Sequence, residues 1–209
     1  MKSCRAGDVV YIHFSGHGQP VEDQNKDEAD GWDEAIIPYD AQKFYKKGVY
    51  EGANHILDDE LNVSFNKLRK KVGPKGIVCV VIDACHAGDI YRGDDDEEAF
   101  CRGTIYTFSP SGKAYEPRKN ADSNFRKFGI KQIAGYSDIL ILEACRSYQS
   151  NHEIKYNGQY HGPLSYYVNK TLQSQKLMPS LRWVNQIMRL MDGDIHLSKQ
   201  QMVFETTLK

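Results

Sequence analysis

A histidine and a cysteine each follow a run of apolar, β-branched residues, and together they could form a nucleophile and its base. Val9–Phe14 leads to His17, and Ile77–Ile82 leads to Cys85. Two adjacent parallel strands would place His17 and Cys85 side by side at one edge of a sheet. A cysteine, whose ordinary pKa is about 8.5, needs a base close by to become a thiolate near neutral pH. The pair therefore predicts nucleophilic catalysis, with Cys85 attacking and His17 moving the proton.

Two other histidines compete with His17 as the base. His13 lies on the first strand itself, so we expect it to pack or hydrogen-bond in the core. His86 adjoins the nucleophile in the chain, so its side chain should point elsewhere. Both stay open as alternatives at this stage.

The composition excludes several function classes and sets the size of the molecule. The chain has 209 residues, 40% of them hydrophobic, which suits a single domain over residues 1–209. The net charge of −1 favours neither nucleic acid nor an anionic membrane as a partner. No apolar run approaches the roughly 20 residues of a membrane span. The five cysteines are odd in number and scattered, which favours a reducing compartment such as the cytoplasm.

Strands and helices are expected to alternate along the chain, which favours an α/β layered domain with a mainly parallel sheet. The helix opening at Asp58 carries Leu61, Phe65, Leu68 and Val72 at helical spacing. A loop is expected over Gln19–Asp33, and a second loop or a hairpin over Ala41–His55. The expected strands are Asp8–Phe14, Ile77–Ile82, Ile139–Leu142 and Met202–Glu205, with a short extended segment at Ala35–Pro38. Two further helices are expected, at His161–Leu172 and Leu181–Met191.

The two motifs together resemble those of caspase-like cysteine peptidases (clan CD, peptidase family C14), and among them the metacaspases and bacterial caspase homologues. The first reads His13-Phe14-Ser15-Gly16-His17-Gly18 and the second Asp83-Ala84-Cys85-His86-Ala87-Gly88. Three further segments resemble the family in the same order: Asp30–Pro38, Ile56–Leu61, and Glu143–Ser150 followed by His161–Ser165.

The resemblance implies a three-layer α/β/α fold and a cysteine endopeptidase acting on polypeptides. Family members normally have about two strand–helix units before the histidine strand, and here that strand begins near residue 1. The resemblance therefore suggests that N-terminal strands are missing from this chain or are supplied elsewhere. An insertion relative to the family is expected over Gln42–His55.

The resemblance also assigns the residues around the reacting pair. The backbone N–H groups of Gly18 and Cys85 would bind the oxyanion. Asp83 would form the acidic floor of a pocket for Arg or Lys. Ser147, Gln149 and Arg146 belong to the segment that resembles the substrate loop. If Arg146 pointed into the pocket, it would neutralise Asp83 and favour acidic substrates instead.

Calcium is the one cofactor that the resemblance raises, as an activator that the chemistry itself does not require. Asp58 and Asp59 could bind it through their carboxylates, with Asp89 or Asp94 completing the set of ligands. The alternative is that Asp58 and Asp59 are acids at a helix N-terminus, favoured there by the helix dipole.

Residues 90–131 form a long, charged stretch of poor pattern that is too long for an ordinary connection. It contains several basic residues, namely Arg92, Arg102, Lys113, Arg118, Lys119, Arg126, Lys127 and Lys131. An enzyme that cuts after basic residues would find its own best substrate there, so we expect a processing loop and a zymogen. Three readings stay open: an Arg/Lys-specific peptidase, an acid-specific caspase-type peptidase, and a catalytically weak signalling or scaffold domain of the same fold.

Overall fold

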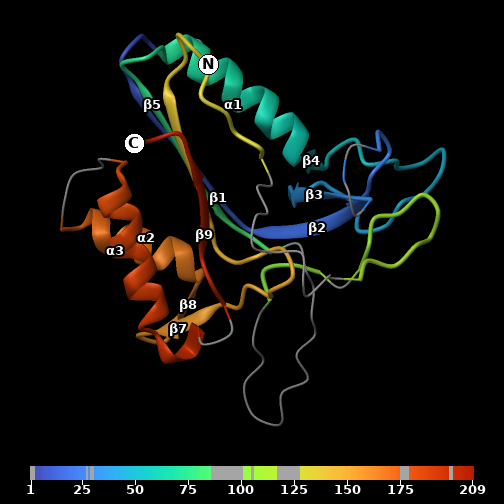
Figure 1. The fold of residues 1–209 in the computed structure, drawn as a ribbon. Helices are drawn as coiled ribbons and strands as arrows, with labels where there is room; N and C mark the ends of the chain where they lie inside the picture. Colours follow the sequence, from blue (N-terminus) through green and yellow to red (C-terminus); the bar gives the residue numbers. More distant parts are fainter. Residues whose placement is uncertain are drawn as a thin grey trace.

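A computed structural model shows a mixed α/β fold built on a four-stranded central sheet (Figure 1). It describes residues 3–26, 28, 31–85, 101–104, 106–116, 128–174, 179–197 and 200–209. The strand order is β1-β5-β6-β9. The first three strands pair in parallel, and β9 pairs antiparallel to β6. Their bounds are β1 Val9–Ser15, β5 Ile77–Asp83, β6 Asp138–Glu143 and β9 Val203–Thr206.

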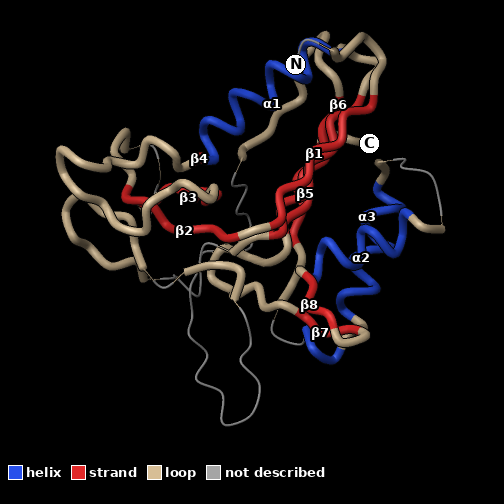
Figure 2. Tube along the Cα trace, turned by 180° about the vertical axis from the view of Figure 1, so that it is seen from behind, coloured by secondary structure: helices blue, strands red, loops and turns tan. Residues whose placement is uncertain are grey.

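Helices cover both faces of this sheet and make three layers (Figures 1 and 2). On β5, Val78 and Val80 pack with α1 (Asp58–Val72). Cys79 and Val81 face the other way and pack with α2 (Pro163–Leu172) and α3 (Leu181–Asp192). Because alternate residues of a strand point to opposite faces, a continuously apolar β5 lies between two apolar layers. The expectation of a three-layer α/β/α domain is confirmed.

Helix α1 has the bounds that its apolar spacing predicts. Leu61, Phe65, Leu68 and Val72 are all buried against the sheet. The helix starts where the Glu60 carboxylate accepts the N–H of Leu57 at 3.3 Å. It ends at Gly73, whose φ of +66° few other residues adopt. The helix delivers the chain to β5, and therefore to Cys85.

The expected loop over Gln19–Asp33 is wrong at both ends. Residues His17–Glu22 form β2, which pairs antiparallel with β3 (Trp32–Ile37), and β3 pairs with β4 (Ile56–Leu57). These three strands form a second sheet that extends to one side of the first (Figure 1). Strand β2 was not predicted because its sequence is polar and lacks apolar alternation. Its cross-strand hydrogen bonds define it instead.

A short hairpin before α2 was not expected. Its strands are β7 (Ile154–Tyr156) and β8 (Gln159–His161). The turn is Asn157-Gly158, with φ of +51° and +77°. Asn-Gly with two positive φ values is the preferred two-residue hairpin turn, so the signal was present in the sequence. As a result α2 begins at Pro163 rather than His161.

The chain ends with the 3₁₀ turn η1 (Ile195–Leu197) and then β9. Among the described residues, no helix has both the length and the apolar character that crossing a membrane requires.

Candidate active site

The register of β1 on β5 brings the strand ends that carry His17 and Cys85 to one edge of the sheet. Ser15 and Asp83 are the last partners of the two strands, and the N–H of Gly16 donates to the carbonyl oxygen of Asp83 at 3.2 Å. His17 and Cys85 each follow that pair by two residues. His17 is exposed at the start of β2, whereas Cys85 is fully buried. Their roles as base and nucleophile stay predictions.

Two main-chain N–H groups at this edge converge on one oxygen atom. The N–H of Cys85 donates to the carbonyl oxygen of Arg102 at 2.9 Å, and the N–H of Gly18 donates to the same oxygen at 3.2 Å. Gly18 and Cys85 are the two residues expected to bind an oxyanion. Donors fixed by the main chain suit an oxygen that gains negative charge, because they need no rearrangement during reaction. A peptide carbonyl therefore already lies where the expected donors meet.

The surroundings of Cys85 favour its protonated thiol over the thiolate. It donates to the carbonyl oxygen of Gln149 at 3.1 Å, and the thiol of Cys145 donates to the same oxygen at 3.3 Å. A hydrogen bond with Cys101 lowers the pKa of Cys85. The hydrogen bond with Cys145, burial and the charge on Cys145 together outweigh this effect and raise the pKa well above its ordinary value.

Asp83 is fully buried and its carboxylate is oriented by two donors. Oδ1 accepts from the side-chain amide of Asn151 at 2.8 Å, and Oδ2 accepts from the N–H of Ser165 at 2.7 Å. Ser165 lies in the first turn of α2, where main-chain N–H groups have no partner within the helix and favour a negative charge. The carboxylate is therefore fixed in place while its charge still faces the neighbouring cation.

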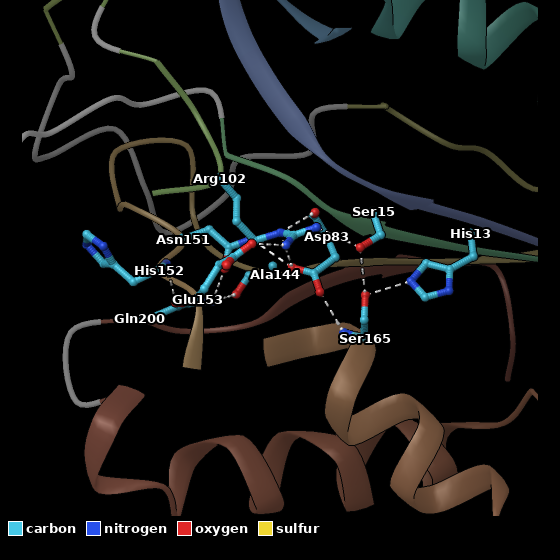
Figure 3. A network of polar contacts seen from close by, with 10 residues as sticks. All are labelled: His13, Ser15, Asp83, Arg102, Ala144, Asn151, His152, Glu153, Ser165 and Gln200. Carbon is cyan, nitrogen blue, oxygen red and sulfur yellow. Dashed lines mark hydrogen bonds and ion pairs between the residues drawn. The ribbon is translucent and has the colours of Figure 1, made fainter. Parts of the chain in front are cut away.

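That cation is the guanidinium group of Arg102, which is 8% exposed (Figure 3). Its Nε donates to the carbonyl oxygen of Asp83 at 3.1 Å and lies 3.6 Å from Oδ1. Nη1 donates to Glu153 at 2.7 Å, and Nη2 donates to the hydroxyl of Ser15 at 2.6 Å. Three groups from three segments thus take three different nitrogens of one guanidinium, which is the arrangement that distinguishes Arg from Lys.

Glycine at position 162 is required by the closeness of this pair. A Cβ atom there would overlap Oδ2 of Asp83 and would lie 2.9 Å from Cζ of Arg102. Its φ of −65° is ordinary, so the constraint comes from space rather than from the backbone angle. Gly162 therefore forms a wall of the pocket through its main chain alone.

A second layer of hydrogen bonds supports the pocket from Gln200, which precedes β9. The Gln200 amide donates to the side-chain oxygen of Asn151 at 2.9 Å and to the carbonyl oxygen of Ala144 at 3.0 Å. Gln200 also accepts the N–H of His152 at 3.3 Å. Because Asn151 in turn donates to Asp83 (Figure 3), Gln200 helps to orient the acid of the pocket.

His13 lies beside this pocket and not in the core. Its Nε2 is 2.9 Å from the hydroxyl of Ser165, which is itself 3.3 Å from that of Ser15 (Figure 3). The expected hydrogen bond is therefore found, but the residue is exposed on β1. His86, the other competing base, lies outside the described residues.

The three residues expected in the substrate loop lie in the turn after β6, where the carbonyl oxygen of Gln149 accepts the Cys85 thiol. Arg146 donates from Nε to the side chain of Gln201 at 3.0 Å, whereas the cation beside Asp83 is Arg102. The Gln149 side chain accepts the N–H groups of Arg146 and Gln201, at 3.2 and 3.1 Å. Ser147 is half-buried in the same turn. Substrate contacts of these three residues stay predictions.

Calcium binding at Asp58 and Asp59 also stays a prediction. Asp58 is buried at the first residue of α1, and Asp59 accepts a hydrogen bond from Asn25 at 3.1 Å. Within the described residues, no group of three or more His, Cys, Asp or Glu side chains is arranged to bind a metal ion. Asp89 and Asp94, expected to complete the ligands, lie outside those residues.

Sequence reasoning missed most of the pocket around Asp83. Ser15 and Gly162 lie inside the segments that resemble the family. The resemblance therefore indicated that they are near the site, but it did not indicate that they line the pocket. Asn151 and Glu153 follow the third strand in a polar segment without periodicity. Nothing local distinguishes such residues from an ordinary loop, because their role comes from segments far apart in the chain.

The chain is similar in sequence to known metacaspases. Residues 1–92 match the family model of the metacaspase, peptidase C14 domain. The chain is 23% identical to metacaspase-1B of Aspergillus oryzae over 216 residues, covering 92% of this chain and 49% of that protein. It is 38% identical to metacaspase-2 of Arabidopsis thaliana over 89 residues, 42% of this chain and 18% of that one.

Solved structures contain the same fold. The crystal structure of protein GSU0716 from Geobacter sulfurreducens matches with a TM-score of 0.56 at 20% identity, over 100% of this chain and 69% of that one. The chain spans about half the length of the curated relatives that it matches along most of its own. In its motifs and in these relatives, the chain is similar to the caspase-like peptidases of family C14.

Proposed function

We propose that this protein is a cysteine endopeptidase that cleaves polypeptides after arginine, and less readily after lysine. One observation supports this most strongly: a guanidinium group is bound by Asp83, Glu153 and Ser15, next to the paired N–H groups of Gly18 and Cys85. A substrate arginine bound in the same way would present its carbonyl oxygen to those two donors. One substrate residue would then be bound through its side chain and attacked at its carbonyl carbon.

The reaction follows from the groups at the two strand ends. In the proposal, His17 takes the proton of Cys85, and the thiolate attacks the carbonyl carbon. The N–H groups of Gly18 and Cys85 stabilise the oxyanion, which elsewhere is worth about 3–4 kcal/mol for each donor. His17 then protonates the departing amine, and water hydrolyses the thioester.

Preference for arginine over lysine rests on the shape of the pocket. Three nitrogens of Arg102 reach three separate acceptors. A lysine ammonium is a single point of charge and cannot take all three positions at once. Both residues would be cleaved, with arginine favoured.

The acid-specific alternative receives less support. It requires Arg146 to face the pocket, whereas the Arg146 guanidinium donates to Gln201 and the cation at Asp83 is Arg102. The alternative of a catalytically weak signalling or scaffold domain stays open. A measurement of peptide turnover decides it.

The proposal includes self-processing within residues 90–131, calcium as an activator, and a cytoplasmic location. All five cysteines are thiols rather than disulfides, which supports a reducing compartment. The processing loop is supported by Arg102, which belongs to that stretch and lies in the basic-residue pocket.

Fluorogenic peptides with Arg, Lys or Asp before the scissile bond test the function, with and without calcium. Wild type should hydrolyse Arg peptides fastest and leave Asp peptides intact. Cys85→Ala should reduce turnover by about 10⁴-fold or more, as loss of a nucleophile does in other hydrolases. Activity that survives Cys85→Ala would reject the mechanism, and hydrolysis of Asp peptides alone would reject the specificity.

A further inference from the structure

Residues Cys101–Gly103 lie along the site in the manner of a bound peptide. The N–H of Arg102 donates to the carbonyl oxygen of Asn151 at 2.8 Å. Next to it, Cys101 forms an antiparallel bridge with His152. Extended peptides commonly bind proteins by adding a strand in this way, with the main chain giving affinity and side-chain pockets giving specificity.

Arg102 combines the three contacts expected of the residue before a scissile bond. Its N–H pairs with the strand-like segment at Asn151, its side chain enters the Asp83 pocket, and its carbonyl oxygen accepts from Gly18 and Cys85. A buried arginine serving only as a structural ion pair would need the side-chain contacts alone. The carbonyl position is the additional and independent observation.

The residue that follows also fits this interpretation. A Cβ atom on Gly103 would lie 2.5 Å from the carbonyl oxygen of Cys85 and 3.2 Å from its Cβ. The main chain at Gly103 therefore passes close to the main chain and the Cβ atom of Cys85, and only glycine has room there. Since the Arg102 carbonyl oxygen also accepts the N–H of Cys85, the peptide bond between Arg102 and Gly103 lies beside that residue.

We propose that this segment is the enzyme's own first substrate and that the bond cleaved is Arg102–Gly103. The inference rests on the proposed function. The Cys85 sulfur forms a bond to the Arg102 carbonyl carbon, and the bond to the Gly103 nitrogen breaks as that nitrogen takes a proton from His17. Water then hydrolyses the thioester, leaving a carboxylate on Arg102 and a thiol on Cys85.

The thiol must first lose its present hydrogen bond. Cys85 donates to the carbonyl oxygen of Gln149, and a thiolate has no proton to donate. Deprotonation therefore ends that contact and releases the sulfur toward the carbonyl carbon. Until then, the bound segment excludes other substrates from the pocket.

The chain beyond the bond is anchored as well. Phe108 bridges in parallel to Val21, donates its N–H to Pro20 at 3.0 Å and accepts that of Glu22 at 2.9 Å. The Glu22 carboxylate also accepts from Ser109 at 2.6 Å. With both sides tethered, the segment presents Arg102 to the pocket at an effective concentration in the millimolar range or above.

The test compares purified wild type with Cys85→Ala, Arg102→Ala, Gly103→Ala and Lys113→Ala, by intact mass and N-terminal sequencing. Lys113 is a matched control, because it is a basic residue of the same stretch that pairs only loosely with Glu22, at 3.7 Å. Wild type and Lys113→Ala should yield a fragment beginning at Gly103. Cys85→Ala and Arg102→Ala should not, and Gly103→Ala should yield it at least tenfold more slowly. The rate in wild type should not change on dilution, because the cut is within one molecule.

The outcomes separate this inference from the function on which it rests. Arg peptides hydrolysed by a wild type that stays uncut, or that is cut at another bond, would overturn the internal substrate alone. Absence of both activities would overturn the proposed function as well. If Arg102→Ala fails to fold, Gly103→Ala decides the matter, since it keeps the ion pairs: its own cleavage should slow, and its hydrolysis of Arg peptides should rise only as the cut form accumulates. Full hydrolysis of Arg peptides by uncut Gly103→Ala would overturn the internal substrate.

Discussion

Arg102 lies against Asp83 with its Nε 3.1 Å from the carbonyl oxygen and 3.6 Å from the carboxylate of that residue. Asp83 is the last residue of β5, and Arg102 belongs to a segment without regular structure. A buried charge is costly unless it is paired and hydrogen-bonded. Emptying the pocket of Arg102 therefore requires another cation or water to replace it.

Gly162→Ala should lower kcat/KM for Arg peptides by about 100-fold, since small displacements at a reacting centre have effects of that size. The added Cβ would overlap the Asp83 carboxylate and crowd the guanidinium. Steady-state kinetics checks the prediction. Gly16→Ala is the matched control, because its Cβ would meet no atom within 4 Å, and it should retain most of its activity. Equal losses in both variants would contradict the steric explanation.

Glu153→Gln should reduce kcat/KM for Arg peptides by about 10- to 100-fold, from a hydrogen bond to a charged group worth about 1.5–3 kcal/mol. Glu153 bonds Nη1, an atom that lysine lacks. The kcat/KM for Lys peptides should therefore fall less than that for Arg peptides, and the ratio of the two values should decrease. An unchanged ratio would show that Glu153 does not read the guanidinium.

Cys85 should react slowly with iodoacetamide while Arg102 remains bound. A hydrogen bond with Cys101 lowers the pKa of Cys85, but Cys145 and burial together raise it well above its usual value, so little thiolate is present near neutral pH. In the His17→Ala background, which should stay uncut, adding Arg102→Ala should increase labelling of Cys85 severalfold. Cys4, part-exposed and far along the chain, is the internal standard. Equal labelling with and without Arg102 would contradict the shielding.

The fragments of self-processing should stay together under native conditions. Cleavage after Arg102 would separate β5 from β6, which pair in parallel from Ile77–Asp138 to Ile82–Glu143. Both strands are buried between the helix layers, so the cut removes no core contact. Size-exclusion chromatography should give one peak that resolves into two chains only in denaturant. Two native peaks would show that the loop itself holds the halves together.

Acid should destabilise the protein through His55, which is buried and hydrogen-bonded to Gln19 of β2. Burial lowers the pKa of His55. Its Nδ1 lies 3.0 Å from the Tyr50 hydroxyl and its Nε2 lies 3.1 Å from Oε1 of Gln19. A lowered folded pKa gives stability that is present above about pH 6.5, the unfolded value, and is lost as the pH falls through the folded one.

Thermal melts at pH 7.5 and 5.5 check this expectation. The melting temperature of wild type should fall between the two values. His55→Gln should be less stable at both, with a smaller fall, because the titrating group is gone. The same pH dependence in both proteins would assign the effect to other groups.

The sequence by itself determined the elements that have a local signature. Helix α1 follows from apolar residues three and four apart, and β5 follows from an unbroken apolar run that only a buried strand explains. Parallel pairing of two such strands then brings His17 and Cys85 to one edge, because chain direction alone decides where strand ends lie. The family motifs added Asp83 and the two main-chain donors.

Only the tertiary structure decided what occupies the pocket. Ser15, Arg102, Asn151, Glu153 and Gly162 come from four separate segments, and no periodicity links them. Contacts between distant segments depend on how whole elements pack, and a polar loop residue has the same local sequence whether it faces water or a buried acid. For this reason the sequence pointed to a stretch of about 40 residues as a processing loop, whereas the structure places one arginine of that stretch against the acid.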